Sequence, residues 1–322
     1  MKAGVASENG VAVADIAQPR PKPNEVLVKV KAAALNRADL TTGRGLPHGP
    51  GGGIGHPIGI EWTGEVIEVG SEAKDVWPGE RVMCSGNGGY AEYAVSDWGR
   101  TFPIPNGVSY EDAATLPVSL ITLHNALITA GRMQPGDSVL IQGASSGVGL
   151  MGLQIAKLMG AKLVIGSSTN AERRARLKEF GADLAVDTRD PTWPDHILKA
   201  TDGKGVNVVV DMLSGPLVTP LMRATALLGR IVNVGRLAGT NADFDFNLHA
   251  LRRIDYIGVT FRTRTLDEVR VISRLMRADL WDHVKAGKLK LPIDMRFPLD
   301  KVAEAHARMH ENKHFGKIVL TM

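Results

Sequence analysis

SVLIQGASSGVGLMG, residues 138–152, contains the strongest structural signal in this chain. Val139, Leu140 and Ile141 form a short apolar run, which is typical of a strand buried on both faces. Small residues follow, and an apolar pattern at helical spacing begins at Val148. The order predicts a strand, a sharp turn and a helix.

Three glycines in this stretch, Gly147, Gly149 and Gly152, form a GxGxxG motif. In a strand–turn–helix context the first glycine permits the turn, the second lets a pyrophosphate approach, and the third allows close helix–strand packing. The free N–H groups of the helix start attract phosphate. The motif predicts a dinucleotide site, with contacts from Ser145, Ser146, Gly147 and Val148.

The next predicted strand, Lys162 to Gly166, ends at Ser167 and Ser168. An NAD site usually has an acid about twenty residues past the first glycine, to bind the ribose 2′-hydroxyl. Here two serines stand instead, followed by Arg173 and Arg174. Serine and arginine can bind a 2′-phosphate, so the sequence favours NADP(H), with Arg173 as the nearer arginine. Alternatively, the arginines are only the solvated face of a helix.

The composition is that of a globular soluble protein, with 322 residues, 44% hydrophobic and 22% charged. This length suits two domains. The net charge of +4 is spread without a basic block, so no nucleic-acid partner is expected. The single cysteine excludes an internal disulfide and suits the cytoplasm. We expect no signal peptide and no membrane span, because no apolar run approaches about 18 residues.

The first third has the pattern of short strands and turns, which favours a compact barrel-like domain. Strands are predicted at 25–32, 62–69, 81–84 and 89–95. Residues 43–59 contain eight glycines and three prolines and are predicted to form a long loop at a functional rim. A helix capped by Ser109 is predicted to continue through Leu127.

Strands and helices then alternate, which predicts a doubly wound parallel sheet. Six strands are expected, at 139–141, 163–165, 184–186, 206–210, 231–234 and 256–259. The helices between them include 171–180, with a capping box at Thr169 and Glu172, and 217–228.

The C-terminal region is predicted to complete the first domain. A capping box at Thr265 and Glu268 begins a helix to about Ala286, and strand, helix and strand follow at 293–297, 299–310 and 317–320. This tail is too small to form its own core. The predicted domains are therefore 1–118 with 265–322, and 119–264.

Motifs along almost the whole chain resemble the zinc-free quinone oxidoreductases of the medium-chain dehydrogenase/reductase superfamily. They are Ala34 to Leu40 (ALNRADL), Gly59 to Gly64 (GIEWTG), Gly88 to Tyr93 (GGYAEY), Gly143 to Gly149 (GASSGVG), Asp211 at a strand end, Phe261 to Arg264 (FRTR) and Gly316 to Leu320 (GKIVL). The resemblance implies a GroES-like catalytic domain, a Rossmann domain that binds NADPH, a cleft between them and a homodimer joined through the Rossmann sheet edges.

The zinc-using relatives place metal ligands where this chain has Asn36, Ile60 and, approximately, Val118. These side chains cannot form a tetrahedral zinc site, and one cysteine cannot form the four-cysteine structural site. We therefore expect no metal. Without a Lewis acid, hydride transfer to a quinone or an α,β-unsaturated carbonyl is favoured over alcohol oxidation.

The catalytic candidates are Asn36, Arg44 and His48. Asn36 is a candidate to bind the substrate oxygen or the nicotinamide ribose, or else only fixes its loop. Arg44 and His48 lie on the glycine-rich loop and can meet the acceptor there. Asp39 is expected to brace this segment rather than to transfer protons. The absence of a tyrosine that many relatives carry near Pro47 leaves the substrate preference open.

Further cofactor contacts are expected from position or from the resemblance. Val234, Gly235 and Arg236 end the fifth strand, at the edge where ligands bind in such sheets. Resemblance alone implies Thr122, Phe261, Arg262, Thr263 and Lys317, and Lys317 has a solvated surface lysine as its alternative.

Three functions are compatible with these observations. The first is an NADPH-dependent quinone or enone reductase. The second is an enoyl-thioester reductase like those of lipid and polyketide synthesis. The third is a non-catalytic NADPH-binding protein with a structural or nucleic-acid-binding role, which the lack of a basic, aromatic stripe disfavours.

Overall fold

The computed structural model describes residues 1–49 and 51–322. These residues form two compact units. Unit 1 comprises Met1–Ile121 and Phe261–Met322, and unit 2 comprises Thr122–Thr260. Pro50, within the predicted glycine-rich loop, lies outside the described residues. The rest of that loop contains no helix or strand, as predicted.

Unit 2 is built on a six-stranded sheet in which every neighbouring pair is parallel. Its strands are β8 (Ser138–Gln142), β9 (Leu163–Ser167), β10 (Leu184–Val186), β11 (Val206–Asp211), β12 (Thr225–Asn233) and β13 (Asp255–Gly258). The order β10-β9-β8-β11-β12-β13 reverses its direction between β8 and β11. This doubly wound Rossmann order confirms the predicted parallel sheet.

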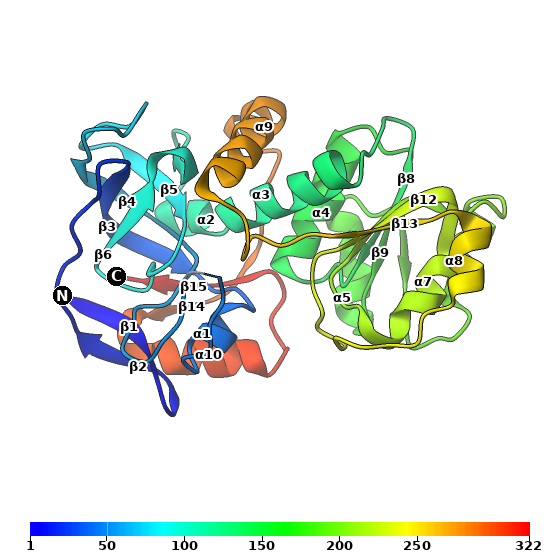
Figure 1. Cartoon of the computed structure of the whole chain (residues 1–322), viewed down its shortest axis with the longest axis horizontal. Coiled ribbons are helices and arrows are strands. Elements are labelled where there is room, and N and C mark those ends of the chain that lie inside the picture. Colours follow the sequence, from blue (N-terminus) through cyan, green and yellow to red (C-terminus); the bar gives the residue numbers. More distant parts are fainter. Residues whose placement is uncertain (50) are drawn as a thin grey trace. The chain divides into compact units, whose positions relative to one another are not determined.

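Helices connect the strands of unit 2 (Figure 1). They are α4 (Gly147–Leu158), α5 (Ala171–Arg176), α6 (Trp193–Ala200), α7 (Val218–Ala224) and α8 (Phe246–Arg252), with short turns η3 (Leu177–Phe180) and η4 (Gly215–Leu217). Leu140, Ile165, Val209 and Ile231 from four neighbouring strands are fully buried beneath them. Burial on both faces explains the continuous apolar runs that the sequence showed.

One helix prediction in unit 2 was wrong in extent, and a second was correct in extent but wrong in its cap and in its last turn. The predicted helix 217–228 ends at Ala224, because Thr225 pairs with Val206 of β11 and Leu228 has a left-handed φ of +59°. The predicted helix 171–180 tightens into a 3₁₀ turn after Arg176. Its cap is Asn170, which accepts a bond from the Arg173 N–H at 2.9 Å, and not Thr169.

Unit 1 contains a seven-stranded sheet that joins strands from the first third of the chain to the two C-terminal strands. Its path is β14 (Ile293–Pro298), β15 (Lys317–Thr321), β3 (Glu25–Ala34), β4 (Glu61–Val69), β5 (Arg81–Ser85) and β7 (Thr101–Pro103), and β6 (Tyr93–Asp97) also pairs with β3. In Figure 1 the red strand β15 lies beside the blue strand β3, with which it pairs antiparallel. The predicted tail strands and helix are confirmed, and they complete this sheet.

The helices of unit 1 are short apart from one. They are α1 (Asp39–Thr42), η1 (Trp98–Arg100), α2 (Tyr110–Ala114), α9 (Leu266–Lys285), η5 (Leu299–Lys301) and α10 (Val302–His310). The capping box of Thr265 and Glu268 at the start of α9 is confirmed.

Some strands of unit 1 differ from the prediction. The strand predicted at 89–95 begins only at Tyr93, because the N–H groups of Gly89 and Tyr90 bond to the loop carbonyls of Gly59 and Ile58. The hairpin of β1 (Lys2–Ser7) and β2 (Gly10–Asp15) was not predicted. Its signal was Asn9-Gly10, a common hairpin turn pair.

The helical segment after Ser109 is longer than predicted. Ser109 caps α2 as expected, α3 (Pro117–His124) follows, and a π-helical turn, η2 (Asn125–Ala130), ends the segment. By length and composition, Tyr110–Ala130 could cross a membrane, contrary to the sequence expectation, but 72% of its most apolar window is buried in the protein. One such helix is weak evidence for a membrane span, since core helices of soluble proteins share this composition.

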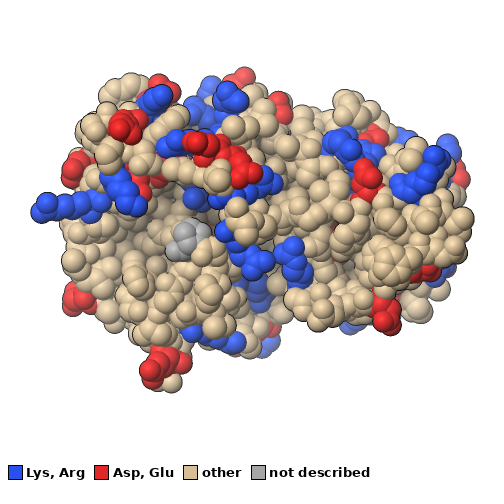
Figure 2. Space-filling model, in the orientation of Figure 1, with Lys and Arg blue, Asp and Glu red and all other residues tan. Residues whose placement is uncertain are grey.

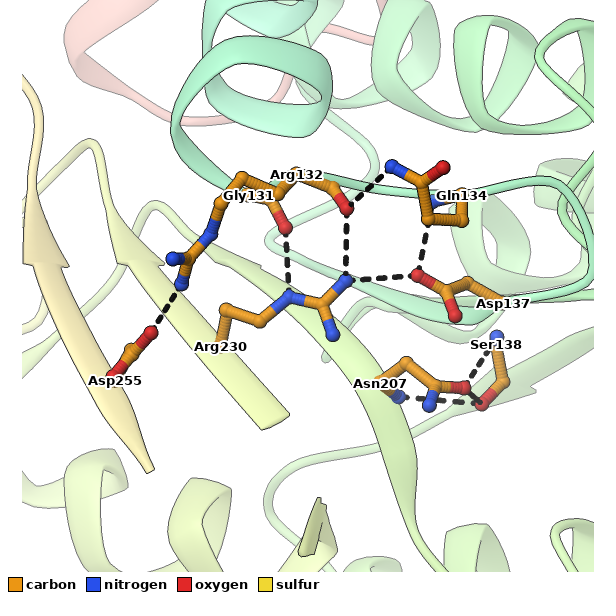
Figure 3. A network of polar contacts seen from close by, with 8 residues as sticks. All are labelled: Gly131, Arg132, Gln134, Asp137, Ser138, Asn207, Arg230 and Asp255. Carbon is orange, nitrogen blue, oxygen red and sulfur yellow. Dashed lines mark hydrogen bonds and ion pairs between the residues drawn. The ribbon is translucent and has the colours of Figure 1, made fainter. Parts of the chain in front are cut away.

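Arg230 of β12 links three parts of unit 2 at the amino-terminal edge of the sheet (Figure 3). Its guanidinium donates to the carbonyls of Gly131 and Arg132 and to the carboxylate of Asp137, at 2.8, 3.1 and 2.8 Å. The side chains of Arg230 and Asp137 are 15% and 16% exposed. Arg230 therefore ties β12 to the turn that leads into β8.

Replacing Arg230 with methionine is expected to lower the free energy of unfolding by about 2–4 kcal/mol, because a mostly buried carboxylate and two carbonyls lose their donor. Urea unfolding of the variant measures this loss. Arg223→Met is the control, since Arg223 forms an ion pair in which both side chains are at least half exposed. Equal stability of the two variants would contradict the prediction.

Candidate functional site

The carboxyl ends of β8 and β9 form a hydrogen-bonded turn in unit 2. The N–H of Gly143 donates to Ser167 Oγ at 2.9 Å, and this hydroxyl donates to Gln142 Oε1 at 2.7 Å. Ser146 caps α4 by accepting from the Gly149 N–H at 3.1 Å. The first N–H groups of α4 lack partners within the helix, so this turn presents donors suited to a phosphate.

The glycines of this turn differ in part from their predicted roles. The left-handed residue is Gly143, with φ +75°, whereas Gly147 is the first helical residue of α4. A Cβ on Gly149 would lie 2.6 Å from Ala144 Cα, so this glycine lets the helix start lie against the turn. A Cβ on Gly152 would meet Leu123 at 2.7 Å and Ile141 at 3.2 Å, which confirms its packing role.

The residues predicted to determine whether NAD or NADP binds lie together beside this turn. Ser168 is buried and its hydroxyl donates to Ser145 Oγ at 3.1 Å. Arg174 donates to the Ser168 carbonyl and to Asp187, each at 2.9 Å, so its guanidinium is already bound. Arg173 lies half-buried in the first turn of α5. No acid ends β9. Asp187, after β10, accepts from Arg174, and hydrogen bonds from Arg189 lower its pKa to about 2.

Polar groups continue along the same edge of the sheet, at the ends of β11 and β12. The carbonyl of Asp211 accepts from the N–H groups of Val234 and Gly235 at 2.8 and 3.1 Å. These two residues were predicted to contact the cofactor, but their N–H groups are already bonded and are not available to a ligand. Arg236 follows them and is half-buried, as is Thr122 of α3. Burial raises the pKa of Asp211, whose carboxylate accepts from two backbone N–H groups.

A second polar cluster lies in unit 1 and contains Asn36 and Lys317. Lys317 Nζ donates to Asn36 Oδ1 at 2.8 Å and forms an ion pair with Glu61, and Asn36 Nδ2 donates to Glu61 Oε1 at 2.8 Å. The second Glu61 oxygen accepts from the Val118 N–H at 2.9 Å. Lys317 is therefore no surface lysine, and its side chain is 2% exposed.

Asp39 holds the Asn36 segment of this cluster by hydrogen bonds, as predicted. Its Oδ2 accepts from the Asn36 N–H at 2.7 Å and from the Tyr90 hydroxyl at 2.6 Å. Asp39 is fully buried, and burial raises its pKa to about 7.

The raised pKa of Asp39 makes its contribution to stability depend on pH. The folded protein holds this proton more tightly than the unfolded chain, so stability falls as pH rises from about 4 to about 7. Asp39→Asn removes this titration. We expect the unfolding free energy of the variant, relative to the native chain, to improve between pH 5 and pH 8. Urea unfolding at both pH values measures it, and a pH-independent difference would contradict the raised pKa.

The glycine-rich loop brings two other predicted residues together in unit 1. A Cβ on Gly49 would lie 3.2 Å from Arg262 Cα, and the Arg262 charge, after burial, lowers the pKa of the neighbouring His48. Burial and the Arg262 charge therefore favour the neutral form of His48. Arg44 is exposed on the same loop. The predicted cofactor contacts Phe261, Arg262 and Thr263 belong to unit 1, not to unit 2.

Comparison with known proteins shows the family. The family described as "Alcohol dehydrogenase GroES-like domain" matches residues 22–106, and "Zinc-binding dehydrogenase" matches residues 147–277. Quinone oxidoreductase-like protein 2 of Bos taurus is 31% identical over 313 residues, covering 94% of this chain and 87% of that protein. The chain belongs to the quinone oxidoreductase family of medium-chain dehydrogenases/reductases.

Two further relatives bear on the chemistry of this family member. A phenolphthiocerol/phthiocerol polyketide synthase of Mycobacterium tuberculosis is 32% identical over 310 residues; the match covers 96% of this chain but spans only 14% of that protein. The mycobacterial protein Rv1454c, whose structure was solved in complex with NADPH, has a TM-score of 0.88 and 25% identity, with both chains fully covered.

The residues of this quinone oxidoreductase family member do not fit the zinc of the zinc-binding dehydrogenases. Asn36, Ile60 and Val118 offer no thiolate or imidazole. Cys84 is buried, and burial raises its pKa to about 12. Among residues 1–49 and 51–322, no group of three or more His, Cys, Asp or Glu side chains is arranged to hold a metal.

A dinucleotide does fit unit 2. Gly149 lets the start of α4 lie directly against the turn, and the Gln142 Nε2 amide, whose side chain also accepts from Ser167, is buried there without a partner. Sequence reasoning missed Gln142, as it missed Glu61 and Tyr90 as site residues. A polar residue ending an apolar strand run, as at Gln142, was the available signal. Glu61 and Tyr90 lie in two of the motifs that carried the resemblance, but their roles were not predicted because their partners lie far away in the sequence.

Proposed function

We propose that this protein is an NADPH-dependent reductase that delivers hydride to a quinone or an α,β-unsaturated carbonyl without zinc. The observation that carries the proposal is the cluster in unit 1, where the amide of Asn36 is bonded to the carboxylate of Glu61 and the ammonium of Lys317 and offers no set of metal ligands. Such a site provides no Lewis acid to ionise an alcohol, so an acceptor that needs little activation is favoured.

The cofactor is proposed to bind at the carboxyl edge of the unit 2 sheet. The start of α4, with Ser145, Ser146, Gly147 and Val148, would hold the pyrophosphate. Ser168, with Arg173, would receive the 2′-phosphate, because no carboxylate at the end of β9 repels it. Ser167, whose hydroxyl accepts from Gly143 and donates to Gln142, would hold the turn in place. When bound, the reduced nicotinamide supplies the hydride. Thr122, Val234, Gly235, Arg236, Phe261, Arg262, Thr263 and Lys317 remain proposed contacts on family resemblance or position.

The acceptor is proposed to bind to unit 1, near Asn36 and the glycine-rich loop. Arg44 and Arg262 are the exposed cations of this region and would attract a polar oxygen of the acceptor. Burial and the Arg262 charge lower the pKa of His48, so we assign it a role as a contact for the acceptor and not as a general acid.

An enoyl-thioester reductase is the second candidate, which the polyketide synthase relative favours. A panel of acceptors separates the two functions. The purified protein is tested for NADPH oxidation with 9,10-phenanthrenequinone, an alkyl enone and crotonyl-CoA. The proposal expects turnover with the quinone or the enone. A preference for crotonyl-CoA would favour the thioester reductase, and tight NADPH binding without any turnover would favour a binding protein.

We also propose a cytoplasmic homodimer that forms through the edge of the Rossmann sheet, without nucleic acid. Near the edge strand β13 several large apolar residues are exposed, namely Leu228, Phe246, Leu251 and Tyr256. On the face seen in Figure 2, acidic residues lie beside many of the basic residues, and several other basic residues gather without an acidic neighbour. Sedimentation is expected to show a dimer, and the double variant Phe246→Asp/Leu251→Asp a folded monomer.

A further inference from the structure

A cavity of about 820 Å³ lies in unit 2, at the amino-terminal edge of its sheet. Its walls include Ser138, Leu163 and Asn207, which are the first or second residues of β8, β9 and β11. The proposed cofactor site lies at the carboxyl ends of the same strands, so this cavity is a separate place in the unit. Cavities of roughly 300–1,000 Å³ are typical of small-molecule sites.

The charged side chains that line this cavity are mainly basic. They are Lys162, Lys204, Arg252 and one acid, Asp202, which leaves a formal surplus of two positive charges. In the part of the chain that the structure describes, none of these three cations forms an ion pair, whereas Arg230 of the same unit does. Basic side chains that surround a hollow without acidic partners attract an anionic ligand.

Asn207 adds a hydrogen-bond donor whose direction is fixed. Its Oδ1 accepts from the N–H and from the hydroxyl of Ser138, each at 2.9 Å (Figure 3). Because a backbone N–H only donates, the atom that faces Ser138 must be the amide oxygen. The Nδ2 group is therefore turned away from Ser138, and no hydrogen bond among the described residues uses it. This half-buried amide thus has two N–H groups to offer a ligand in the cavity.

Arg252 is also held in place by the fold. Its Nη1 donates to the Thr225 carbonyl at 2.7 Å, and the residue is half-buried. A guanidinium has five N–H donors in a rigid plane, so donors remain for an oxygen-rich anion. Lys162 and Lys204 are exposed and add ammonium donors on flexible stems. The cavity thus combines two fixed donors with two mobile ones.

We propose that this cavity binds a phosphorylated small molecule, with its phosphate held by Asn207, Arg252 and the two lysines. A phosphomonoester carries about 1.5 to 2 negative charges at pH 7, which matches the surplus of two positive charges better than a single carboxylate does. This inference goes beyond the proposed reduction, because it involves neither NADPH nor an acceptor.

The uncharged part of the ligand has an apolar wall to pack against. Leu227 is 55% exposed and Leu163 is half-buried, and both line the cavity. A large apolar side chain that is left exposed beside donors for an anion suits a ligand with one charged and one apolar end.

The test measures the binding of phenyl phosphate by isothermal titration calorimetry, at low ionic strength and pH 7.5. Phenyl sulfate is the matched probe, since it has a similar shape and only one negative charge. The native chain is expected to bind phenyl phosphate with a Kd below about 1 mM, at least about tenfold more tightly than phenyl sulfate. Absence of phenyl phosphate binding, or equal binding of the two probes, would overturn the proposal.

The double variant Lys162→Gln/Lys204→Gln locates the bound phosphate. Its Kd for phenyl phosphate is expected to rise at least about tenfold, because two charged donors are lost. The control Lys22→Gln/Lys288→Gln removes the same charge at two exposed lysines of unit 1 and is expected to bind like the native chain. The proposal is wrong if these two double variants bind equally, or if only Ser168→Asp weakens binding, since the phosphate would then lie at the end of β9.

Asn207→Asp tests the fixed donor. The new carboxylate still accepts from Ser138 but replaces the amide donor with a like charge, so the Kd for phenyl phosphate is expected to rise at least about tenfold. Asn241→Asp, which places the same charge at an exposed position after β12, is the control, and urea unfolding verifies that both variants fold. Equal binding by the two variants would contradict the role of Asn207. Because these titrations need neither NADPH nor turnover, failure of the proposed reductase and failure of this inference are distinguishable.

Discussion

Gly149→Ala is expected to weaken NADPH binding by at least about tenfold and to lower the free energy of unfolding by about 1–3 kcal/mol. The added Cβ would lie 2.6 Å from Ala144 Cα and 2.8 Å from its carbonyl carbon and oxygen. These are backbone atoms of the turn, so the helix start and the turn must separate. The N–H groups proposed to hold the pyrophosphate then lose their arrangement.

Gly258→Ala is the matched control for this change. Gly258 ends β13 in the same unit, and a Cβ there would meet no atom within 4 Å. Fluorescence titration with NADPH and urea unfolding of both variants provide the measurement. If Gly149→Ala binds NADPH as tightly as Gly258→Ala does, the proposed pyrophosphate site at the start of α4 is wrong.

Ser168→Asp is expected to change the cofactor preference about 100-fold in favour of NADH. A carboxylate at this position would repel the 2′-phosphate of NADPH, since juxtaposed like charges cost several kcal/mol. The same carboxylate can accept a hydrogen bond from the ribose 2′-hydroxyl of NADH. Ser168 is buried beside the turn and bonded to Ser145, so the new charge would be little screened by solvent.

The control for this prediction carries the same charge elsewhere in unit 2. Ala200 ends α6 and is exposed, beside Ser138 and Asn207 from the amino-terminal ends of β8 and β11. The ratio of kcat/KM for NADPH to that for NADH is measured for Ser168→Asp, Ala200→Asp and the native chain. If Ser168→Asp leaves this ratio unchanged, the proposed binding of the 2′-phosphate at the end of β9 is wrong.

Local sequence signals predicted unit 2 well, because its elements depend on neighbouring residues. The run before Gly143 and the helical pattern after Ser146 were sufficient for β8, the turn and α4. The same reasoning failed at 225–228. The apolar run there favoured a helix, but the segment belongs to β12, which pairs with β11. Tertiary pairing overrode propensity there.

The site of unit 1 was predictable only in part. The sequence marked Asn36 and Lys317 separately, from two motifs 281 residues apart. Their contact, and the carboxylate of Glu61 between them, depend on the register of β3, β4 and β15, which no local pattern encodes. The resemblance directed attention to Asn36, Ile60 and Val118, which offer no thiolate or imidazole, and the single cysteine excluded a four-cysteine site without any structure.

The most direct test of the central proposal is the steady-state rate of NADPH oxidation, with NADH alongside, at saturating 9,10-phenanthrenequinone. The serines and arginine near the end of β9, and the metal-free cluster of unit 1, predict turnover with kcat/KM at least about tenfold higher for NADPH, a difference of about 1.4 kcal/mol. Preference for NADH would show that Arg173 is only a solvated helix residue. Absence of turnover with both cofactors would contradict the proposed reductase.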